Sequence, residues 1–473
     1  MVHTFSLNGF DIALDVYSGS VHVCDPVSLE AIRMYETQPL ETVMGRLLAD
    51  HPDNPEVTAQ AVTELLDTLD ELQAQGKLYT RDIYQNSALH LKKDPNLVKA
   101  LCLHVAHACN LTCSYCFAGQ GHYQGEAALM PLSTAKQALD FLVKHSGSRR
   151  HLEVDFFGGE PLLNWQTVKD TVAHGRELEK QTGKVFRFTL TTNGVLLDDE
   201  VTAFCNQEMH NVVLSLDGRP EVHDHYRKDH QGRGSYHTVV PKFQRFVKLR
   251  GDKEYYIRGT FTRRNLDFLE DIRHMADLGF DKLSMEPVVT APDSPEALRE
   301  EDLPVIFQQY EELAREMLAR EKQGKGFQFY HYMLDLAHGP CVYKRLSGCG
   351  SGTEYLAVTP AGALYPCHQF VGDGEAYRLG SLKEGITNRE LQEAFQHNTV
   401  YEHTACGDCW AKLYCAGGCA ANACHAQGSI HGVYDYGCKL FKKRMECAIM
   451  LAAAKEEISS VKAGGESYGD QNF

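Results

Sequence analysis

The stretch His107-Ala108-Cys109-Asn110-Leu111-Thr112-Cys113-Ser114-Tyr115-Cys116-Phe117 decides the fold of this 473-residue chain. Its three cysteines are separated by three and then two residues. A tetrahedral zinc site needs four ligands, whereas three closely spaced thiolates suit a [4Fe-4S] cluster and leave its fourth iron open to a cofactor. The spacing therefore predicts that Cys109, Cys113 and Cys116 hold such a cluster. The alternative is three buried or zinc-binding cysteines.

Length and composition restrict the class of protein further. A chain of 473 residues predicts two or three domains. It contains no apolar run of about 18 residues and no basic-then-apolar signal at its N-terminus, so we expect a cytoplasmic protein with no membrane partner. The net charge of −16 argues against nucleic acid as the main partner. Sixteen cysteines in a reducing compartment favour metal binding or catalysis over disulfides.

Residues 1–90 predict a small N-terminal domain. Strand-like alternation at 10–14 and 21–23 precedes three helical patterns that begin near residues 26, 40 and 56. This outline is that of a winged helix-turn-helix, but 14 acidic against 4 basic side chains argue against DNA binding. The exposed edge of a wing can instead add a peptide as an extra strand. The segment resembles the leader-peptide recognition domains fused to peptide-modifying enzymes, with a structural cap as the alternative.

Residues 91–330 alternate between strand and helix patterns. Strands are predicted at 98–105, 151–157, 185–192, 211–216, 255–261 and 282–286, with helices at 132–144 and 163–181. Repeated βα units imply an α/β fold in which a parallel sheet curls into an open barrel, with reactive groups at the carboxyl ends of its strands. The charged stretch 296–325 is expected to be the helix that closes the barrel.

Distinctive motifs follow the predicted strands. They are Gly158-Gly159-Glu160-Pro161, Thr191-Thr192-Asn193-Gly194, Ser215-Leu216-Asp217-Gly218 and Met285-Glu286-Pro287-Val288. Together with the three-cysteine loop, they resemble the motifs of the radical SAM enzymes. The resemblance implies a partial (β/α)6 barrel whose cluster binds S-adenosylmethionine and, on receiving one electron, cleaves it to a 5′-deoxyadenosyl radical.

The same resemblance implies a set of cofactor-binding residues. The glycine-rich motif would hold the amino group of the cofactor's methionine, and polar side chains would lie near the ribose and carboxylate. Arg227 would neutralise the carboxylate, and Met285, with Glu286, Pro287 and Val288, would line the adenine. A surface role is the alternative for Arg227 and for Arg258. The set is Tyr115, Gly158, Gly159, Glu160, Pro161, Thr192, Asn193, Ser215, Asp217, Arg227 and Met285.

Residues 331–455 hold a second group of cysteines. Cys349 is followed by twelve residues, Gly362, four residues and Cys367; then come Cys406-x2-Cys409-x5-Cys415-x3-Cys419 and, after eighteen residues, Cys438. This spacing resembles the SPASM extension, which implies two auxiliary [4Fe-4S] clusters and three in all. By that resemblance Cys406, Cys409, Cys415 and Cys438 hold one auxiliary cluster, and Cys349, Cys367 and Cys419 hold the other. Its fourth ligand is Cys341, or that iron is open to a substrate thiolate.

Two alternatives concern this C-terminal part. A four-cysteine zinc ribbon would explain only half of its cysteines. The polar tail, residues 456–473, is predicted to be disordered and carries no recognisable chemistry.

Two segments, 339–350 and 365–372, resemble the SCIFF-peptide maturases. That resemblance implies a cysteine-to-threonine thioether crosslink in a cysteine-rich, ribosomally made precursor peptide with a leader, and an electron donor such as a flavodoxin or ferredoxin. The alternatives are an anaerobic sulfatase (formylglycine) maturase, a SPASM enzyme that forms carbon-carbon crosslinks, and an iron-sulfur redox sensor. The sulfatase maturase is disfavoured because His368 stands where related maturases place an acidic residue. The charge of the N-terminal segment and the complete cofactor-binding set disfavour the sensor.

Overall fold

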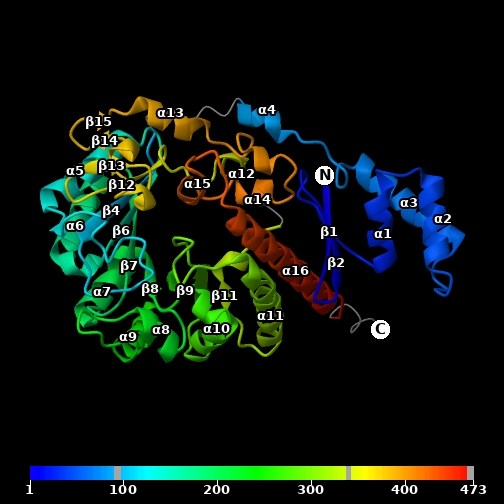
Figure 1. The fold of residues 1–473 in the computed structure, drawn as a ribbon, viewed down its shortest axis with the longest axis horizontal. Coiled ribbons are helices and arrows are strands. Elements are labelled where there is room, and N and C mark those ends of the chain that lie inside the picture. Colours follow the sequence, from blue (N-terminus) through cyan, green and yellow to red (C-terminus); the bar gives the residue numbers. More distant parts are fainter. Residues whose placement is uncertain (90–96, 337–341, 466–473) are drawn as a thin grey trace, which may run out of the picture.

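The computed structural model describes residues 1–89, 97–336 and 342–465. Figure 1 shows the N-terminal sheet and helices on one side of the molecule and a large sheet wrapped by helices on the other. The C-terminal helix α16 (Asp435–Gly465) runs between them and contacts both β1 (Val2–Leu7) of the small sheet and the outer helix α11 (Leu303–Lys322). No helix in the described ranges is long and apolar enough to cross a membrane.

The N-terminal unit is a three-stranded antiparallel sheet packed on three helices. β1 pairs with β2 (Phe10–Asp15), which pairs with β3 (Val21–Cys24). The helices are α1 (Pro26–Tyr35), α2 (Leu40–Asp50) and α3 (Ala59–Ala74). β1 was not predicted; it pairs because Asn8 and Gly9 both adopt positive φ, which a tight hairpin turn requires. The three helices share a small hydrophobic core of their own, which includes Leu29, Ile32 and Leu66.

The large sheet has a parallel centre built from the six predicted strands. In chain order these are β4 (Ala100–His107), β6 (His151–Gly158), β7 (Val185–Thr192), β8 (Met209–Ser215), β9 (Tyr255–Phe261) and β10 (Lys282–Pro287). Each pairs in parallel with the next, which confirms the predicted α/β fold. β11 (Gln328–Phe329) continues the parallel sheet beyond β10.

The C-terminal segment joins the same sheet rather than starting a separate one. β12 (Tyr355–Val358) pairs in parallel with β4, and β13 (Ala363–Tyr365), β14 (Gly380–Ser381) and β15 (Gly385–Ile386) extend the edge in antiparallel pairs. The short β5 (Ala128–Leu129) pairs with β4. The cysteine-rich segment is therefore fixed to the strand that precedes the first cysteine loop.

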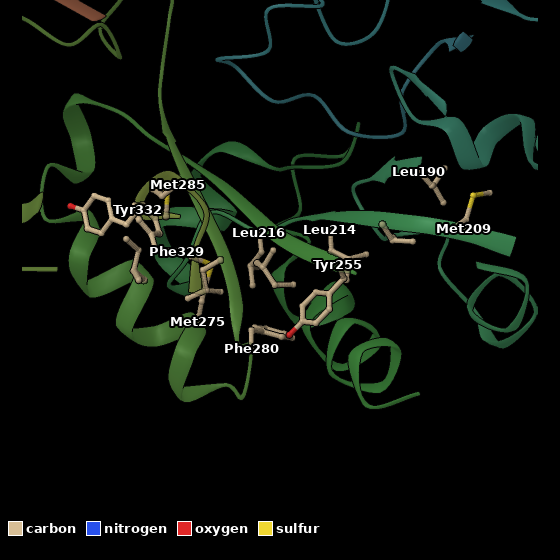
Figure 2. Close-up of a cluster of buried hydrophobic side chains, with 14 of the residues drawn as sticks. Leu190, Met209, Leu214, Leu216, Tyr255, Met275, Phe280, Met285, Phe329 and Tyr332 are labelled. Carbon is tan, nitrogen blue, oxygen red and sulfur yellow. The ribbon is translucent and has the colours of Figure 1, made fainter. Parts of the chain in front are cut away.

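Helices cover the outer face of the sheet and the cysteine-rich segment. Those of the barrel, besides α11, are α5 (Leu132–Lys144), α6 (Trp165–Thr182), α7 (Asp199–Glu208), α8 (Pro220–Tyr226), α9 (Tyr236–Arg250) and α10 (Phe268–Asp277). Those flanking the cysteine-rich segment, besides α16, are α4 (Tyr84–Leu89), α12 (Val342–Ser347), α13 (Arg389–His397), α14 (Lys412–Cys415) and α15 (Ala420–Gln427). One continuous hydrophobic core joins strands and helices, and Figure 2 shows the part of it that contains Leu214, Tyr255, Phe280 and Phe329.

Two predicted boundaries are corrected. The closing helix expected at 296–325 begins at Leu303, because a 3-10 turn, Glu300–Asp302, comes before it and Pro304 occupies its first turn. Helix α16 continues to Gly465, into the tail that was predicted to be disordered, since the alanine-rich run that ends at Ala454 favours a helix. Residues 466–473 of that tail lie outside the described residues.

Candidate active site

A cavity of about 630 Å³ lies between the strand ends and the cysteine-rich segment. Cys109, Cys113 and Cys116 line it on the barrel side. Cys415, Cys419 and Cys438 line it on the C-terminal side. The cavity therefore faces both the predicted cofactor-binding cluster and members of both predicted auxiliary groups.

The cysteines fall into three groups whose members influence one another's ionisation. Burial raises the pKa of Cys109 to about 12, with Cys113 and Cys116 adding to the effect. Burial raises the pKa of Cys415 to about 12, with Cys438, Cys406 and Cys409 adding. Burial also raises the pKa of Cys367, with Cys419 and Cys349 adding. This is the same partition as the resemblance implies; Cys341 lies outside the described residues.

The chemistry of these thiols fits iron-sulfur clusters. In the described part of the chain, no three His, Cys, Asp or Glu side chains converge on a single metal ion, as a mononuclear zinc site would require. In a [4Fe-4S] cluster each thiolate binds a different iron, so the sulfurs stay apart. The raised pKa values keep the Cys109, Cys367 and Cys415 thiols protonated, and bound iron would reverse that preference because a coordinated thiol is deprotonated.

The glycines of the Gly158–Pro161 motif let the chain approach the first cysteine loop. Gly159 N–H donates to the carbonyl of Ala106 at 2.8 Å and Glu160 N–H to that of Ala108 at 2.9 Å. A Cβ on Gly159 would lie 2.1 Å from the Ala108 carbonyl oxygen, so no larger residue fits. Gly158 and Gly159 also line the cavity and offer it their backbone.

Glu160 lies behind the cavity wall. It is 1% exposed and accepts hydrogen bonds from the Thr192 hydroxyl at 2.7 Å, Asn193 N–H at 2.8 Å and Leu162 N–H at 3.0 Å. Burial raises its pKa to about 7 despite these donors. Neither Glu160 nor the buried Pro161 lines the cavity. The structure thus uses Glu160 to join two motifs, whereas the resemblance had placed it on the cofactor's amino group.

Asp217 likewise has protein partners for both of its oxygens. The fully buried carboxylate accepts from Arg227 Nε at 2.9 Å and Nη2 at 3.1 Å, from the Tyr115 hydroxyl at 2.6 Å and from Thr260 N–H at 3.0 Å. Arg227 lines the cavity, but its charge is neutralised by Asp217 rather than left for a cofactor carboxylate. Tyr115 lies between Cys113 and Cys116 in the sequence, so its hydrogen bond to Asp217 anchors the cysteine loop. Thr192, Asn193 and Ser215 line the cavity, as a role near the cofactor would require.

Comparisons with known proteins agree with this architecture. The family model described as "4Fe-4S single cluster domain" matches residues 99–241. The radical SAM cyclopropyl synthase TigE of Paramaledivibacter caminithermalis is 19% identical over 358 residues, which cover 73% of this chain and 72% of that protein. A cysteine-type anaerobic sulfatase-maturating enzyme of Clostridium perfringens is 25% identical over 329 residues, covering 66% and 85%.

A solved structure described as native anSMEcpe with bound AdoMet and Kp18Cys peptide superposes with a TM-score of 0.63 at 20% identity, over 76% of this chain and 99% of that one. The comparisons support the predicted radical SAM/SPASM maturase. The matched family model is that of a 4Fe-4S cluster domain, and the solved structure of the same fold holds AdoMet and a peptide.

Of the Met285–Val288 segment that was predicted to line the adenine, Glu286, Pro287 and Val288 line the cavity, but Met285 does not. Met285 is fully buried in the hydrophobic core, in the cluster with Phe329 and Tyr332 that Figure 2 shows. Side chains alternate between the two faces of a strand, so its neighbour Glu286 faces the cavity instead.

Several lining residues were not predicted as site residues. Thr260 lies on the cavity face of β9 and could have been found from strand alternation. Phe117 could have been found from its place beside Cys116. Arg444 comes from α16, far along the chain, and no local pattern marks it.

Proposed function

We propose that this radical SAM/SPASM maturase forms a thioether between a cysteine sulfur and a threonine carbon in a cysteine-rich, ribosomally made peptide. The observation that carries the proposal is the single cavity shared by the first cysteine loop and by Cys415, Cys419 and Cys438. A substrate side chain in that space would be within reach of both the radical-generating end and the auxiliary end.

Cys109, Cys113 and Cys116 would hold the first cluster, and the other two groups of cysteines the auxiliary clusters, three in all. When bound, these cofactors supply the hydrogen-abstracting radical and an acceptor for the electron released as the bond forms. Crosslinking removes a hydrogen atom from carbon, a proton from the thiol and one electron, so the peptide loses two hydrogens. The backbone of Gly158 and Gly159, with Thr192, Asn193 and Ser215, would orient the cofactor, and the cavity walls would exclude water.

Cys341 is our proposed fourth ligand for the group of Cys349, Cys367 and Cys419. Cys341→Ala should then lose about one cluster's share of iron from reconstituted protein, together with one auxiliary spectroscopic signal. Unchanged iron and spectra would mean instead that this iron is open to a substrate thiolate.

The N-terminal unit is the proposed site for the leader of the precursor peptide. Within the described residues β3 pairs only with β2, so its outer edge is available for an added strand. Val23 on β3 is 43% exposed and offers an apolar contact. A flavodoxin or ferredoxin is the proposed electron donor.

An anaerobic sulfatase maturase is the second candidate, favoured by the similarity to enzymes of that description. Related maturases place an acidic residue after the cysteine that corresponds to Cys367, and here His368 lines the cavity at that position. Burial lowers the pKa of His368 to about 4, so its ring is neutral near pH 7 and able to accept a proton. His368 could therefore still remove a proton from the substrate, although it stands in place of the acidic residue of the sulfatase maturases.

The test is mass spectrometry of peptides after anaerobic incubation with reconstituted enzyme, S-adenosylmethionine and reductant. For a cysteine-rich peptide with its leader, loss of two hydrogens with one cysteine resistant to alkylation supports the thioether. The same loss with every cysteine alkylated indicates a carbon-carbon crosslink or another oxidation. An aldehyde formed in a sulfatase-derived peptide favours the second candidate. Cys113→Ala is the inactive control.

A further inference from the structure

Arg258, Glu286 and Arg444 form a loosely paired group of charged side chains on the cavity wall. They come from β9, the end of β10 and α16, and all three line the cavity. Arg258 Nη2 lies 3.7 Å from Glu286 Oε1, and Arg444 Nη1 lies 3.8 Å from Glu286 Oε2.

These separations leave hydrogen-bonding capacity unused. A direct bond between guanidinium and carboxylate is about 2.7–2.9 Å long and often bidentate. The Arg258 side chain is 51% exposed and that of Glu286 is 30% exposed, so neither is sealed in the protein. By contrast, Arg227 and Asp217 in the same site are in direct bidentate contact.

The fourth neighbour, His331, adds no positive charge. Its Nε2 lies 3.3 Å from Glu286 Oε1 and its Nδ1 lies 3.2 Å from Arg444 Nη1. Burial lowers its pKa to about 4, so the ring is neutral near pH 7. Two guanidinium groups therefore flank one carboxylate, and this wall presents donors on both sides of an acceptor.

One residue of an extended peptide matches that arrangement. In an extended chain the N–H and C=O of one residue point to the same side, as they do when that residue hydrogen-bonds to a neighbouring strand. We propose that Glu286 accepts the N–H of one extended substrate residue while Arg258 and Arg444 donate to main-chain carbonyls beside it. The group is thus a main-chain clamp, and this inference rests on the proposed peptide-modifying function.

The position of the clamp suits substrate alignment. Glu286 pairs in register with Thr260, whose N–H donates to Asp217, and Asp217 also accepts from Tyr115 of the first cysteine loop. A peptide held at Glu286 would therefore share the cavity with Cys109, Cys113 and Cys116 and lie near their loop. Because the clamp contacts only main-chain groups, the enzyme should tolerate changes of side chain at the clamped residue but not loss of its N–H.

The test measures binding separately from turnover. The probe is a radiolabelled, blocked hexapeptide that contains cysteine and threonine and lacks a leader, equilibrated by dialysis with reconstituted enzyme and S-adenosylmethionine. Glu286→Gln and Arg258→Gln should each weaken binding about tenfold, because a hydrogen bond to a charged group is lost or weakened. The matched controls, Glu312→Gln on α11 and Arg245→Gln on α9, should bind as wild type.

A second set of probes replaces one peptide N–H at a time with an ester oxygen. One such ester should weaken binding to wild type about tenfold and have little further effect on Glu286→Gln. Equal binding by wild type and both clamp variants, or no binding by wild type, would overturn the clamp. Weaker binding of S-adenosylmethionine to Arg258→Gln with unchanged peptide binding would assign Arg258 to the cofactor and also overturn it. Variant-sensitive binding without loss of two hydrogens on turnover would remove the proposed thioether chemistry and leave the clamp standing.

Discussion

Replacing Asp217 with asparagine should destabilise the cysteine loop more than any surface substitution in this chain. The Asp217 carboxylate is fully buried and neutralises Arg227, whose side chain is only 11% exposed. Asparagine keeps the shape of the side chain but removes the charge, and its amide N–H₂ would face other donors. Arg227 would then be buried without a counter-ion.

The expected cost follows from the contacts that are lost. Breaking a buried ion pair from one side costs about 3–5 kcal/mol because the remaining charge has no partner. Tyr115→Phe removes only the 2.6 Å hydrogen bond to the same carboxylate, so about 1.5–3 kcal/mol is expected. The two changes should be less than additive, since both act through one acceptor.

Native-state hydrogen exchange of the β8 and β9 amides measures this cost locally, with iron retention by reconstituted protein as a second readout. Asp140→Asn, which alters an exposed pair with His174, is the control and should cost no more than about 1 kcal/mol. The reasoning is refuted if the β8 and β9 amides of Asp217→Asn exchange as slowly as those of the control and the variant retains all of its iron.

Three further outcomes are expected. Gly159→Ala should prevent iron incorporation, because the added Cβ would lie 2.1 Å from the Ala108 carbonyl oxygen. The control Gly45→Ala, on helix α2, meets nothing within 4 Å and should stabilise the protein by about 1 kcal/mol. Equal iron contents in the two variants would contradict the prediction. Burial raises the pKa of Glu160 from 4.5 to about 7, so the folded state holds this proton more tightly than the unfolded state does. The free energy of unfolding should therefore fall by about 3 kcal/mol between pH 4.5 and 7. Urea titrations of cluster-free protein should show a shallower fall for Glu160→Gln. Lys412→Met removes the cation that lies 3.2 Å from Asp82, whose carboxylate keeps the Tyr401 hydroxyl as a donor, and should cost about 3 kcal/mol. The loss should appear as faster proteolytic release of the N-terminal unit. Unchanged proteolysis would show that this ion pair does not hold the two parts together.

Local patterns were sufficient to predict the frame of this protein. The runs at 185–192 and 255–261 became strands with those same bounds, because short β-rich segments bounded by turns have few alternatives. The spacing from Cys109 to Cys116 is likewise local, since it fits one loop. The order of the strands followed from the repeated βα units, which connect neighbours in a parallel sheet.

Contacts between distant segments could not be predicted in this way. Arg444 reaches the cavity only because α16 crosses the molecule, and nothing near it in the sequence indicates that path. Met285 and Glu286 differ by one position, and a strand sends neighbours to opposite faces. Choosing between them required knowing which face of β10 packs on the helices.

The acidic residues of the motifs show how the site is organised. The resemblance suggests that Glu160 and Asp217 contact the cofactor, yet each is satisfied by protein: Glu160 joins the second and third strand ends, and Asp217 joins the fourth and fifth to Tyr115. Buried carboxylates are costly unless every oxygen has a partner, so these bonds fix the loops relative to one another. Their contribution to cofactor binding is thus indirect, through the placement of the cysteine loop and of the lining residues Asn193 and Thr192. A substitution at either carboxylate should therefore disturb several strand ends at once, whereas a change at Ser215, which only lines the cavity, should alter ligand binding alone.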